Sequence, residues 1–351
     1  MGDSINTHRL IFLLATGLAM AWLLGHCAIR WLGPLGFLDV PGGRKRHSGV
    51  IPRVGGFALA GVLALGAAQG WLTNFLGWPG WVGLFVIFVL GILDDRFSLR
   101  ARWKALAGLA IAVALAWGQA PAMAAEPTAL TLFQFSVPRD PLALGVLLAL
   151  LYWVMPQAYN LIDGADGLAL GCSIIVLAAI AIGGAPQPLL LGALLGVLTL
   201  NWPRAKCFLG DGGSLLLGLL LALLAVRTFG STRPDAILWL FAYPLADVFM
   251  VVVIRLATGQ PLGQGDRNHL HHHWKRILGR YSRLRVPILW SQVALCSLGA
   301  LVEGTWNLIP AVGLVALVAQ VVGFSMKAIR FSRAAPVKRK FRQIRRVWSR
   351  V

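Results

Sequence analysis

Long apolar runs, separated by short segments rich in charged residues, glycine or proline, occupy most of the chain. A helix needs roughly 20 mainly apolar residues to cross the hydrocarbon core of a bilayer, and eleven runs approach this length. They cover residues 10–32, 54–73, 78–93, 103–121, 141–158, 168–184, 187–201, 213–229, 236–256, 286–303 and 308–326. The pattern therefore predicts an all-α integral membrane protein with about eleven transmembrane helices. The length of the first run favours a retained helix over a cleaved secretory signal.

The composition supports a membrane location. Hydrophobic residues make up 58% of the chain and charged residues only 13%, and the mean hydropathy is +0.73. A soluble domain is about half apolar and about one quarter charged, so a water-soluble enzyme, a disordered chain and a disulfide scaffold all fit poorly. The four cysteines have neither CxxC nor metal-site spacing, and they indicate no redox chemistry.

The distribution of Lys and Arg predicts the orientation in the membrane. With the N-terminus outside, 28 of the 32 basic residues fall on inner segments, and the outer four are Arg9, Arg139, Arg227 and Arg233. Cytoplasmic loops carry an excess of Lys and Arg, so we expect an outer N-terminus and a cytoplasmic C-terminus. We divide the chain into a polytopic transmembrane domain, residues 1–326, and a basic cytoplasmic tail, residues 327–351. Anionic lipid headgroups account for the basic tail, and no nucleic-acid partner is expected.

Aspartates gather on the predicted cytoplasmic side. Seven of the eleven lie on inner loops or at inner helix ends: Asp39, Asp94, Asp95, Asp163, Asp166, Asp211 and Asp266. The positive-inside rule gives Asp little weight. The one-sided distribution therefore predicts a reaction site at the cytoplasmic face.

Asp247 is the exception, because it lies inside the apolar run 236–256, shortly after Pro244. An ionisable group at this depth is costly, which indicates a role. One alternative interpretation of the whole chain is therefore a polytopic transporter with an intramembrane Asp247 site, since transporter sites lie near the bilayer midplane. A hydrogen bond between helices is the purely structural explanation.

Two adjacent carboxylates, Asp94 and Asp95, end the third apolar run in the segment GILDDRFSLR. Mg²⁺ is usually held by one or two carboxylates together with substrate phosphates, so the pair is a candidate divalent-cation site. An ordinary helix end, with the carboxylates paired to Arg96 and Arg100, is the competing interpretation.

Two glycine-containing segments each precede a predicted helix that starts at the cytoplasmic face. YNLIDGADGLALG contains Asn160, Asp163 and Asp166, and FLGDGGSLLLG contains Asp211. Helix N-termini offer free N–H groups and a positive dipole end to an anion. Helix capping would account for one acid per helix, but it does not account for Asn160 and Asp163.

A histidine-rich segment, DRNHLHHHW, follows the ninth run and contains four of the seven histidines: His269, His271, His272 and His273. With further cations beside them, these imidazoles favour a donor-rich pocket for phosphates or a nucleotide. His269 and His273 have the spacing of a zinc pair on a helix, but the Glu of an HExxH site is missing.

The first inner loop, LDVPGGRKRHSGVIPRVGG, is basic and rich in glycine and proline. A basic run at a membrane surface is usually a topology determinant. Its Pro and Gly residues favour an ordered loop that holds phosphate through Arg44, Lys45 and His47.

Five motifs taken together resemble those of the polyprenyl-phosphate N-acetylhexosamine-1-phosphate transferases, glycosyltransferase family 4. They are, in order, DVPGGRKRHSGVIPRVGG, LDD, NLIDGADGLA, FLGDGGSLLLG and HLHHH. The resemblance covers about residues 35 to 275 by motif and the whole chain by topology. The first loop looks like that of the N-acetylglucosamine branch. The branch that transfers phospho-N-acetylmuramoyl-pentapeptide usually ends its histidine motif in an acid, where this chain has Lys275 and its neighbours.

The resemblance implies a catalytic metal and two substrates. The metal would be Mg²⁺, with Mn²⁺ as an alternative, close to Asp94, Asp95 and Asp211. The donor would be a UDP-sugar that releases UMP, and the acceptor would be undecaprenyl phosphate in the bacterial cytoplasmic membrane. Such a reaction initiates cell-envelope polysaccharides such as the O-antigen of lipopolysaccharide, and a homodimer is compatible with it. Substrate binding would fall to Arg44, Lys45, His47, Asn160, Asp163, Asp166, His269, His271, His272 and His273.

The chemistry of this reaction needs little help from a base, because a phosphate monoester is already mostly dianionic at pH 7. A single displacement is the simpler hypothesis, and a covalent aspartyl-phosphate on Asp94 stays open. A CDP-alcohol phosphotransferase would need further acids within residues 168–184, and that segment has none.

Overall fold

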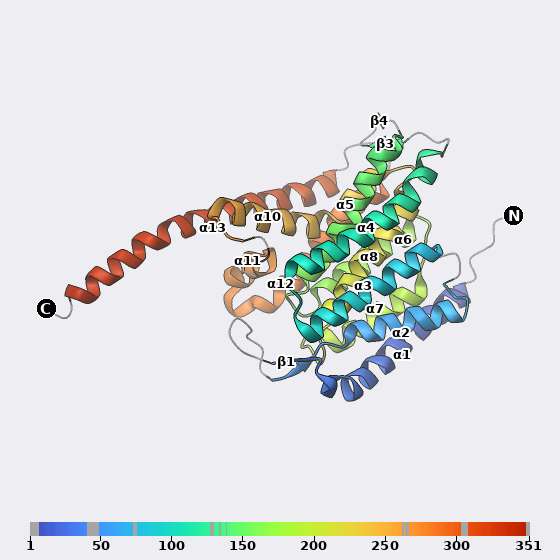
Figure 1. The fold of residues 1–351 in the computed structure, drawn as a ribbon, viewed down its shortest axis with the longest axis horizontal. Helices are drawn as coiled ribbons and strands as arrows, with labels where there is room; N and C mark the ends of the chain where they lie inside the picture. The colour runs from blue at the N-terminus through green and yellow to red at the C-terminus, as the bar shows by residue number, and fades with distance from the viewer. Residues whose placement is uncertain are drawn as a thin grey trace.

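The chain folds into a bundle of α-helices with two small β-hairpins (Figure 1). The structure is a computed structural model, which describes residues 7–40, 49–72, 76–126, 130–132, 135–137, 139–261, 263, 267–302 and 308–348. The elements, in chain order, are α1 (Thr7–Trp31), η1 (Gly33–Leu35), β1 (Leu38–Asp39), β2 (Ile51–Pro52), α2 (Gly55–Ala68), α3 (Trp78–Phe97), α4 (Ala101–Ala124), β3 (Leu130–Leu132), β4 (Phe135–Val137), α5 (Pro141–Ile162), α6 (Leu168–Ile182), α7 (Pro188–Asn201), α8 (Gly210–Phe229), α9 (Pro234–Leu240), α10 (Ala242–Thr258), α11 (Leu270–Leu278), η2 (Gly279–Leu284), α12 (Arg285–Leu301) and α13 (Leu308–Trp348).

Each of the eleven predicted apolar runs coincides with helix. The run at 236–256 is the one that breaks, into α9 and α10, which are bent by 70° relative to each other. Within the part of the chain that the structure describes, six helices are long and apolar enough to cross a membrane, or seven if the bent pair counts as one span, while α2, α6 and α7 are shorter. The protein is thus an all-α membrane protein, as predicted, and the figure of eleven crossings stays a prediction.

Helix α8 runs through the middle of the bundle (Figure 1) and packs against α2, α3, α5, α6 and α9. Its most apolar stretch is 89% buried, which fits a helix that is hydrophobic on all sides. Glycines let its neighbours come close. A Cβ on Gly91 of α3 would lie 2.5 Å from the α8 backbone at Asp211 and Gly212, and Gly218 of α8 meets α5 in the same way. The positions of α3 and α8 are therefore tightly coupled.

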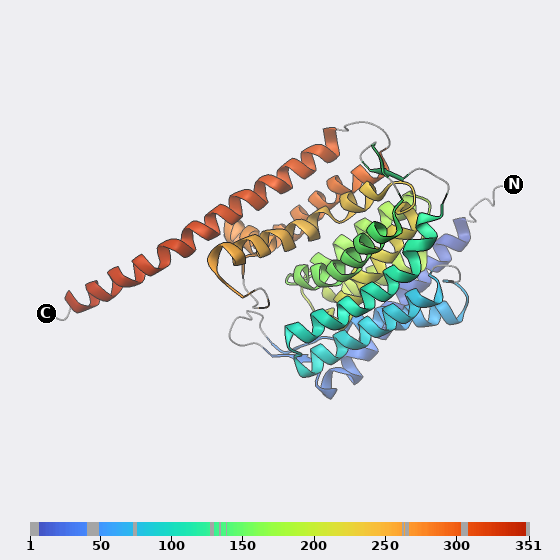
Figure 2. The same ribbon diagram turned by 45° about the horizontal axis from the view of Figure 1, so that its top comes forward.

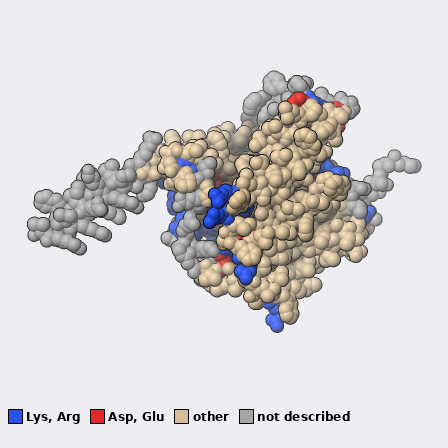
Figure 3. Space-filling model, viewed as in Figure 1, with Lys and Arg blue, Asp and Glu red and all other residues tan. Residues whose placement is uncertain are grey.

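The outside of the bundle is apolar. Trp78 and Trp117 are 78% and 81% exposed, and many Leu, Val and Phe side chains are exposed beside them. The space-filling view shows a broad uncharged surface, with Lys and Arg gathered around a hollow on the side where α11 lies (Figure 3). Apolar exposure on this scale is what a lipid-facing surface requires.

One end of the bundle collects the segments that carry the polar motifs. They are the β1–β2 hairpin, the end of α3, the α5–α6 turn, the start of α8 and the short helix α11 (Figures 1 and 2). The hairpin is antiparallel, with Asp39 opposite Ile51, and it joins α8 because Phe208 donates its N–H to the Pro52 carbonyl at 2.8 Å. Helix α13 continues past the bundle toward the C-terminus (Figure 2).

Candidate active site

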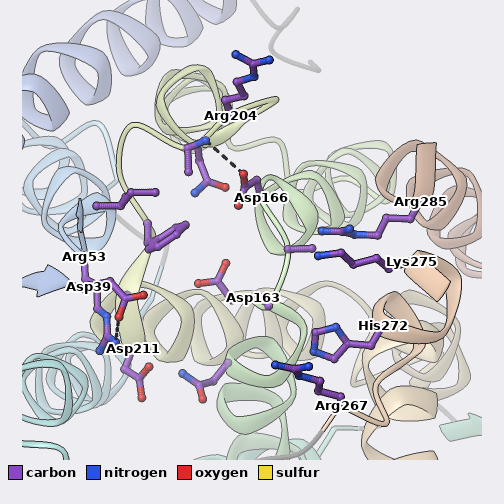
Figure 4. Close-up of a pocket in the computed structure, with 18 of the residues that line it drawn as sticks. Asp39, Arg53, Asp163, Asp166, Arg204, Asp211, Arg267, His272, Lys275 and Arg285 are labelled. Atoms are coloured by element: carbon purple, nitrogen blue, oxygen red, sulfur yellow. Dashed lines mark hydrogen bonds and ion pairs between the residues drawn. The ribbon is translucent and has the colours of Figure 1, made fainter. Parts of the chain in front are cut away.

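A cavity of about 1090 Å³ lies among these segments. Among the described residues, five aspartates and seven basic side chains line it, and Figure 4 shows ten of these twelve labelled. The twelve are Asp39, Asp95, Asp163, Asp166, Asp211, Arg53, Arg204, Arg267, His272, Lys275, Arg276 and Arg285. Of the predicted site residues, the structure brings Asp95, Asn160, Asp163, Asp166, Asp211 and His272 together at this cavity.

Carboxylates from α3 and α8 form one wall. Asp95, near the end of α3, accepts a hydrogen bond from the N–H of Gly212 at 3.0 Å. Asp211 lies in the first turn of α8, where the helix dipole favours a negative charge. The close approach of α3 to α8 is what brings these two carboxylates to the same wall.

Lys104 of α4 forms ion pairs with two acids, Asp94 of α3 and Asp211 of α8. Its Nζ lies 2.6 Å from Oδ2 of Asp94 and 2.8 Å from Oδ2 of Asp211. Asp94 also accepts from the N–H of Leu99 at 2.8 Å, just past the end of α3. Asp94 therefore stands behind the wall, and it does not line the cavity itself.

Arg53, next to β2, is a second cation among these carboxylates. It bonds to Asp39 across the hairpin and lies 3.5 Å from Oδ1 of Asp95. Burial alone lowers the pKa of Arg53, but the hydrogen bond and charge of Asp39, with the charges of Asp95 and Asp211, raise it above its usual value. Arg53 is thus a permanent positive charge that holds the hairpin against the carboxylate wall.

The α5–α6 turn carries the remaining acids. Asn160 donates from Nδ2 to the Ser214 hydroxyl on α8 at 3.0 Å, and Asp166 accepts from the Ala205 N–H at 3.3 Å. The N-terminus of α6 has no side-chain cap, so the capping interpretation does not apply to Asp166. Asp163 lies between the carboxylates of Asp95 and Asp211 on one side and the basic side chains of Arg267, His272 and Lys275 on the other (Figure 4). Burial, and then the charges of neighbouring aspartates, raise the pKa of Asp163 well above its usual value.

A basic wall faces the carboxylates. Arg267, His272, Lys275 and Arg285 extend from α11, from the segment before it and from the start of α12 toward the middle of the cavity (Figure 4). Arg285 forms no ion pair with any residue that the structure describes, and its Nε is buried without a hydrogen-bond partner there. This wall offers positive charge that protein carboxylates only partly neutralise.

The four histidines have different partners, although the rings of His269, His271 and His272 lie against one another. His269 precedes α11 and contacts Oδ2 of Asp247 through Nδ1 at 2.7 Å. His271 is 1% exposed and lies against the α5–α6 turn, and His273 stacks on Phe324 of α13 at 4.6 Å between ring centroids. His272 is the member of the run that lines the cavity. His269 and His273 have different partners, and among the described residues no third His, Cys, Asp or Glu completes a metal site with them, so the geometry gives the zinc alternative no support.

Asp247 serves this histidine segment. It is fully buried, and besides His269 it accepts a hydrogen bond from the N–H of Leu270 at 2.6 Å. It therefore fixes the start of α11 and does not line the cavity. This is the bond between segments that the sequence offered as the structural explanation.

Within the described ranges, no group of three His, Cys, Asp or Glu side chains is arranged as a finished metal site. The carboxylates of Asp95, Asp163 and Asp211 nevertheless line one cavity, and they suit a hard cation that keeps water and phosphate oxygens among its ligands. Burial first, and then the charges of Asp211, Asp95 and Asp166, raise the pKa of Asp163, and a bound cation would offset the repulsion among these carboxylates. Three predicted residues, Arg44, Lys45 and His47, lie outside the described residues, as does Asp266.

Sequence reasoning missed several cations of the site. Arg53, Lys104, Arg204 and Arg285 counted only as determinants of topology, because a basic residue on an inner segment needs no other explanation. Lys104 carried a signal that would have found it. It lies inside an apolar run, close to one end of α4, where a charge is costly unless a partner is present.

Fold and site together define a polytopic membrane protein that holds a highly charged cavity at one end of an apolar helix bundle. Residues 78–229 match the model of glycosyl transferase family 4. The chain is 33% identical to a probable undecaprenyl-phosphate N-acetylglucosaminyl 1-phosphate transferase of Bacillus subtilis (strain 168), over 76% of this chain and 77% of the relative. It is 28% identical to the undecaprenyl-phosphate alpha-N-acetylglucosaminyl 1-phosphate transferase of Escherichia coli (strain K12), over 77% of each chain. The chain belongs to glycosyl transferase family 4.

Proposed function

We propose that the protein transfers an N-acetylhexosamine 1-phosphate from a UDP-sugar to undecaprenyl phosphate and releases UMP. The observation that carries this proposal is the cavity itself, in which carboxylates on one wall face cations on the other at the end of an apolar bundle. The names of the relatives supply the lipid acceptor and the sugar phosphate. N-acetylglucosamine or a related N-acetylated sugar is the proposed cargo, and the initiation of a cell-envelope polysaccharide is the proposed role.

Charge explains why two opposed walls suit this reaction. The acceptor phosphate is mostly dianionic at pH 7, and it must approach the phosphorus of an anionic diphosphate. Preorganised positive charge is the main means by which proteins lower the barrier to such a phosphoryl transfer. Arg267, Lys275 and Arg285 supply it from one side. Burial, and then neighbouring cations, lower the pKa of His272 to about 4, so at pH 7 it adds a neutral imidazole to this wall. We favour a single displacement, since the acceptor is already a nucleophile.

The carboxylate wall is the proposed position of Mg²⁺, or of Mn²⁺ in its place. Asp95, Asp163 and Asp211 are the ligand candidates that line the cavity, with Asp94 held behind them by Lys104. The metal would neutralise charge on the donor diphosphate. The chain's own contribution is to hold the carboxylates in position, through the Gly212 N–H and through Lys104.

We also propose the membrane arrangement, with eleven crossings, an outer N-terminus and the cavity at the cytoplasmic face of a bacterial cytoplasmic membrane. The four basic residues assigned to the outside belong to the end of the bundle opposite the cavity: Arg9 at the start of α1, Arg139 before α5, Arg227 at the end of α8 and Arg233 before α9. A cytoplasmic cavity is where a UDP-sugar would be available. The tail from residue 327 would bind anionic lipids.

Transport is not favoured. Its one supporting feature was Asp247, and that carboxylate is engaged by His269 and by the Leu270 N–H. A buried carboxylate with two partners has a structural explanation, so it needs no cargo to account for it.

The test is to incubate the purified protein with undecaprenyl phosphate, Mg²⁺ and a panel of UDP-sugars and to measure UMP release. We expect release with UDP-N-acetylglucosamine or a 6-deoxy N-acetylated relative. We expect a loss of orders of magnitude in Asp95→Asn and Asp211→Asn, both still monodisperse in detergent. Absence of UMP with every donor would contradict the proposal, and near-normal turnover in both variants at saturating Mg²⁺ would contradict the metal position.

A further inference from the structure

The contact between His271 and Gly164 joins the histidine helix to the α5–α6 turn. A Cβ added to Gly164 would lie 2.6 Å from Nε2 and 2.8 Å from Cε1 of His271. Real Cβ atoms essentially never come this close to another heavy atom. Gly164 has no positive φ, so its backbone would accept an alanine, and the imidazole is what excludes a side chain there.

The imidazole cannot simply move away. His271 is 1% exposed and stacks on His269, with ring planes 14° apart and centroids at 5.6 Å. His269 is in turn held by Asp247 of α10. On the other side of α11, Trp274 donates to Gln320 of α13 at 2.9 Å. Helix α11 is therefore held by contacts to α10 and α13 that do not involve the turn.

The turn is fixed equally well from its far side. The N–H of Gly167 donates to Oδ1 of Asn201 at 2.6 Å, and Asp166 accepts from Ala205. The turn is thus held between the α7–α8 loop and the imidazole of His271. Asp163 and Asp166 lie at the two ends of the turn. Both line the cavity, as does His272, the residue after His271.

The imidazole is an unusual choice for a packing role. Neither of its ring nitrogens has a hydrogen-bond partner among the residues that the structure describes. A polar group buried in this way is unfavourable and needs an explanation. The nitrogen nearest the turn is Nε2, so the backbone of the turn is the polar surface that it faces.

We propose that His271 is a positioning residue, which sets the α5–α6 turn at the distance from α11 at which Asp163 and Asp166 face His272 across the cavity. Gly164 is its required counterpart. This inference rests on the proposed transferase function only for its kinetic measurement. It separates His271 from His272, although the two are neighbours in one histidine run.

A double-mutant cycle tests the contact. In the wild-type background, Gly164→Ala is expected to lower kcat/KM for the UDP-sugar by about tenfold or more, since small displacements of site groups have large kinetic effects. In the His271→Ala background the same change is expected to cost less than about threefold, because the clash is gone. The KM for undecaprenyl phosphate should stay within about twofold throughout. The matched control is Gly118→Ala in α4, where an added Cβ meets nothing within 4 Å.

Conservative replacement separates positioning from simple filling of space. His271→Gln keeps a nitrogen near the turn and is expected to retain more activity than His271→Leu. Equal losses for Gly164→Ala in both backgrounds, or full activity of His271→Leu, would overturn the proposal. If Gly164→Ala fails to fold, the proposal predicts that the double variant folds. If the wild-type protein releases no UMP, the same cycle read as thermal midpoints in detergent still tests the contact and leaves the failure with the proposed function.

Discussion

Removing the charge of Lys104 tests the linkage between the acids of the site. In Lys104→Met, two mostly buried carboxylates lose their shared cation, for the side chains of Lys104, Asp94 and Asp211 are 15%, 11% and 27% exposed. Breaking a buried ion pair costs about 3 to 5 kcal/mol. Asp94 keeps its bond from Leu99 and Asp211 keeps some solvent, so we expect the lower value, about 3 kcal/mol. That is roughly a hundredfold in the unfolding equilibrium.

The assay is thermal unfolding in detergent, first in metal-free buffer and then with Mg²⁺ added. We expect the midpoint of Lys104→Met to fall by about 5 °C and to recover more with Mg²⁺ than that of the wild type, because a divalent cation can replace the ammonium. The control is Lys206→Met, which removes an exposed lysine near the same end of the bundle. A Lys104→Met midpoint equal to that of wild type in metal-free buffer would refute this reasoning.

Three further predictions concern packing, pH and topology. Gly91→Ala should lower turnover at least tenfold, because its Cβ would lie 2.5 Å from the α8 backbone and overpacking of this kind costs about 1 to 3 kcal/mol. Burial and the neighbouring carboxylates raise the pKa of Asp163, so its ionised form opposes folding and stability falls as pH rises above its usual value near 4. Asp163→Asn should therefore unfold at a higher temperature than wild type at pH 8 without metal, with little difference at pH 4, while turnover falls. In a cysteine-free background, a cysteine at Ser231 should react with an impermeant thiol reagent in intact cells, and one at Ser282 only after permeabilisation.

Each of these has a matched comparison and a contrary result. Gly323→Ala is the packing control, since its added Cβ meets nothing within 4 Å, and equal activity of both alanine variants would contradict the coupling of α3 to α8. A stability difference between Asp163→Asn and wild type that does not depend on pH would contradict the origin assigned to the raised pKa. Labelling at Ser282 in intact cells would reverse the proposed orientation.

The helices were predictable because a membrane demands long apolar runs, and every run of that kind is helical here. The break between α9 and α10 was not predicted. The charged residues of the run 236–256 are Asp247 and Arg255, and the rest of it is mainly apolar. Hydropathy therefore gave no sign of a 70° bend. Pro244 lies in the first turn of α10, just after the break, and proline is a common cause of a helix boundary or kink; this was the local signal that hydropathy alone does not contain.

The acids of the site were predictable for a different reason. Aspartate is scarce in this chain, and its concentration on one side has no explanation in membrane insertion. Their partners were not predictable, because Lys104 and Asp211 are 107 positions apart in the chain. The same limit applies to the histidines. Their spacing does not reveal that α11 begins at Leu270, whose N–H donates to Asp247. The residue at which the helix begins decides which imidazole faces the cavity.

Following the phosphorus between the two substrates would test the central claim most directly. UDP-N-acetylglucosamine labelled in its β-phosphate would be incubated with undecaprenyl phosphate, Mg²⁺ and either the wild-type protein or Asp211→Asn, and the lipid phase would then be extracted. We expect the label to move into the lipid with the sugar, in amounts equal to the UMP released, and Asp211→Asn to leave it in the aqueous phase. A label that stays with the nucleotide while the sugar moves, or no transfer by the wild-type protein, would contradict the account.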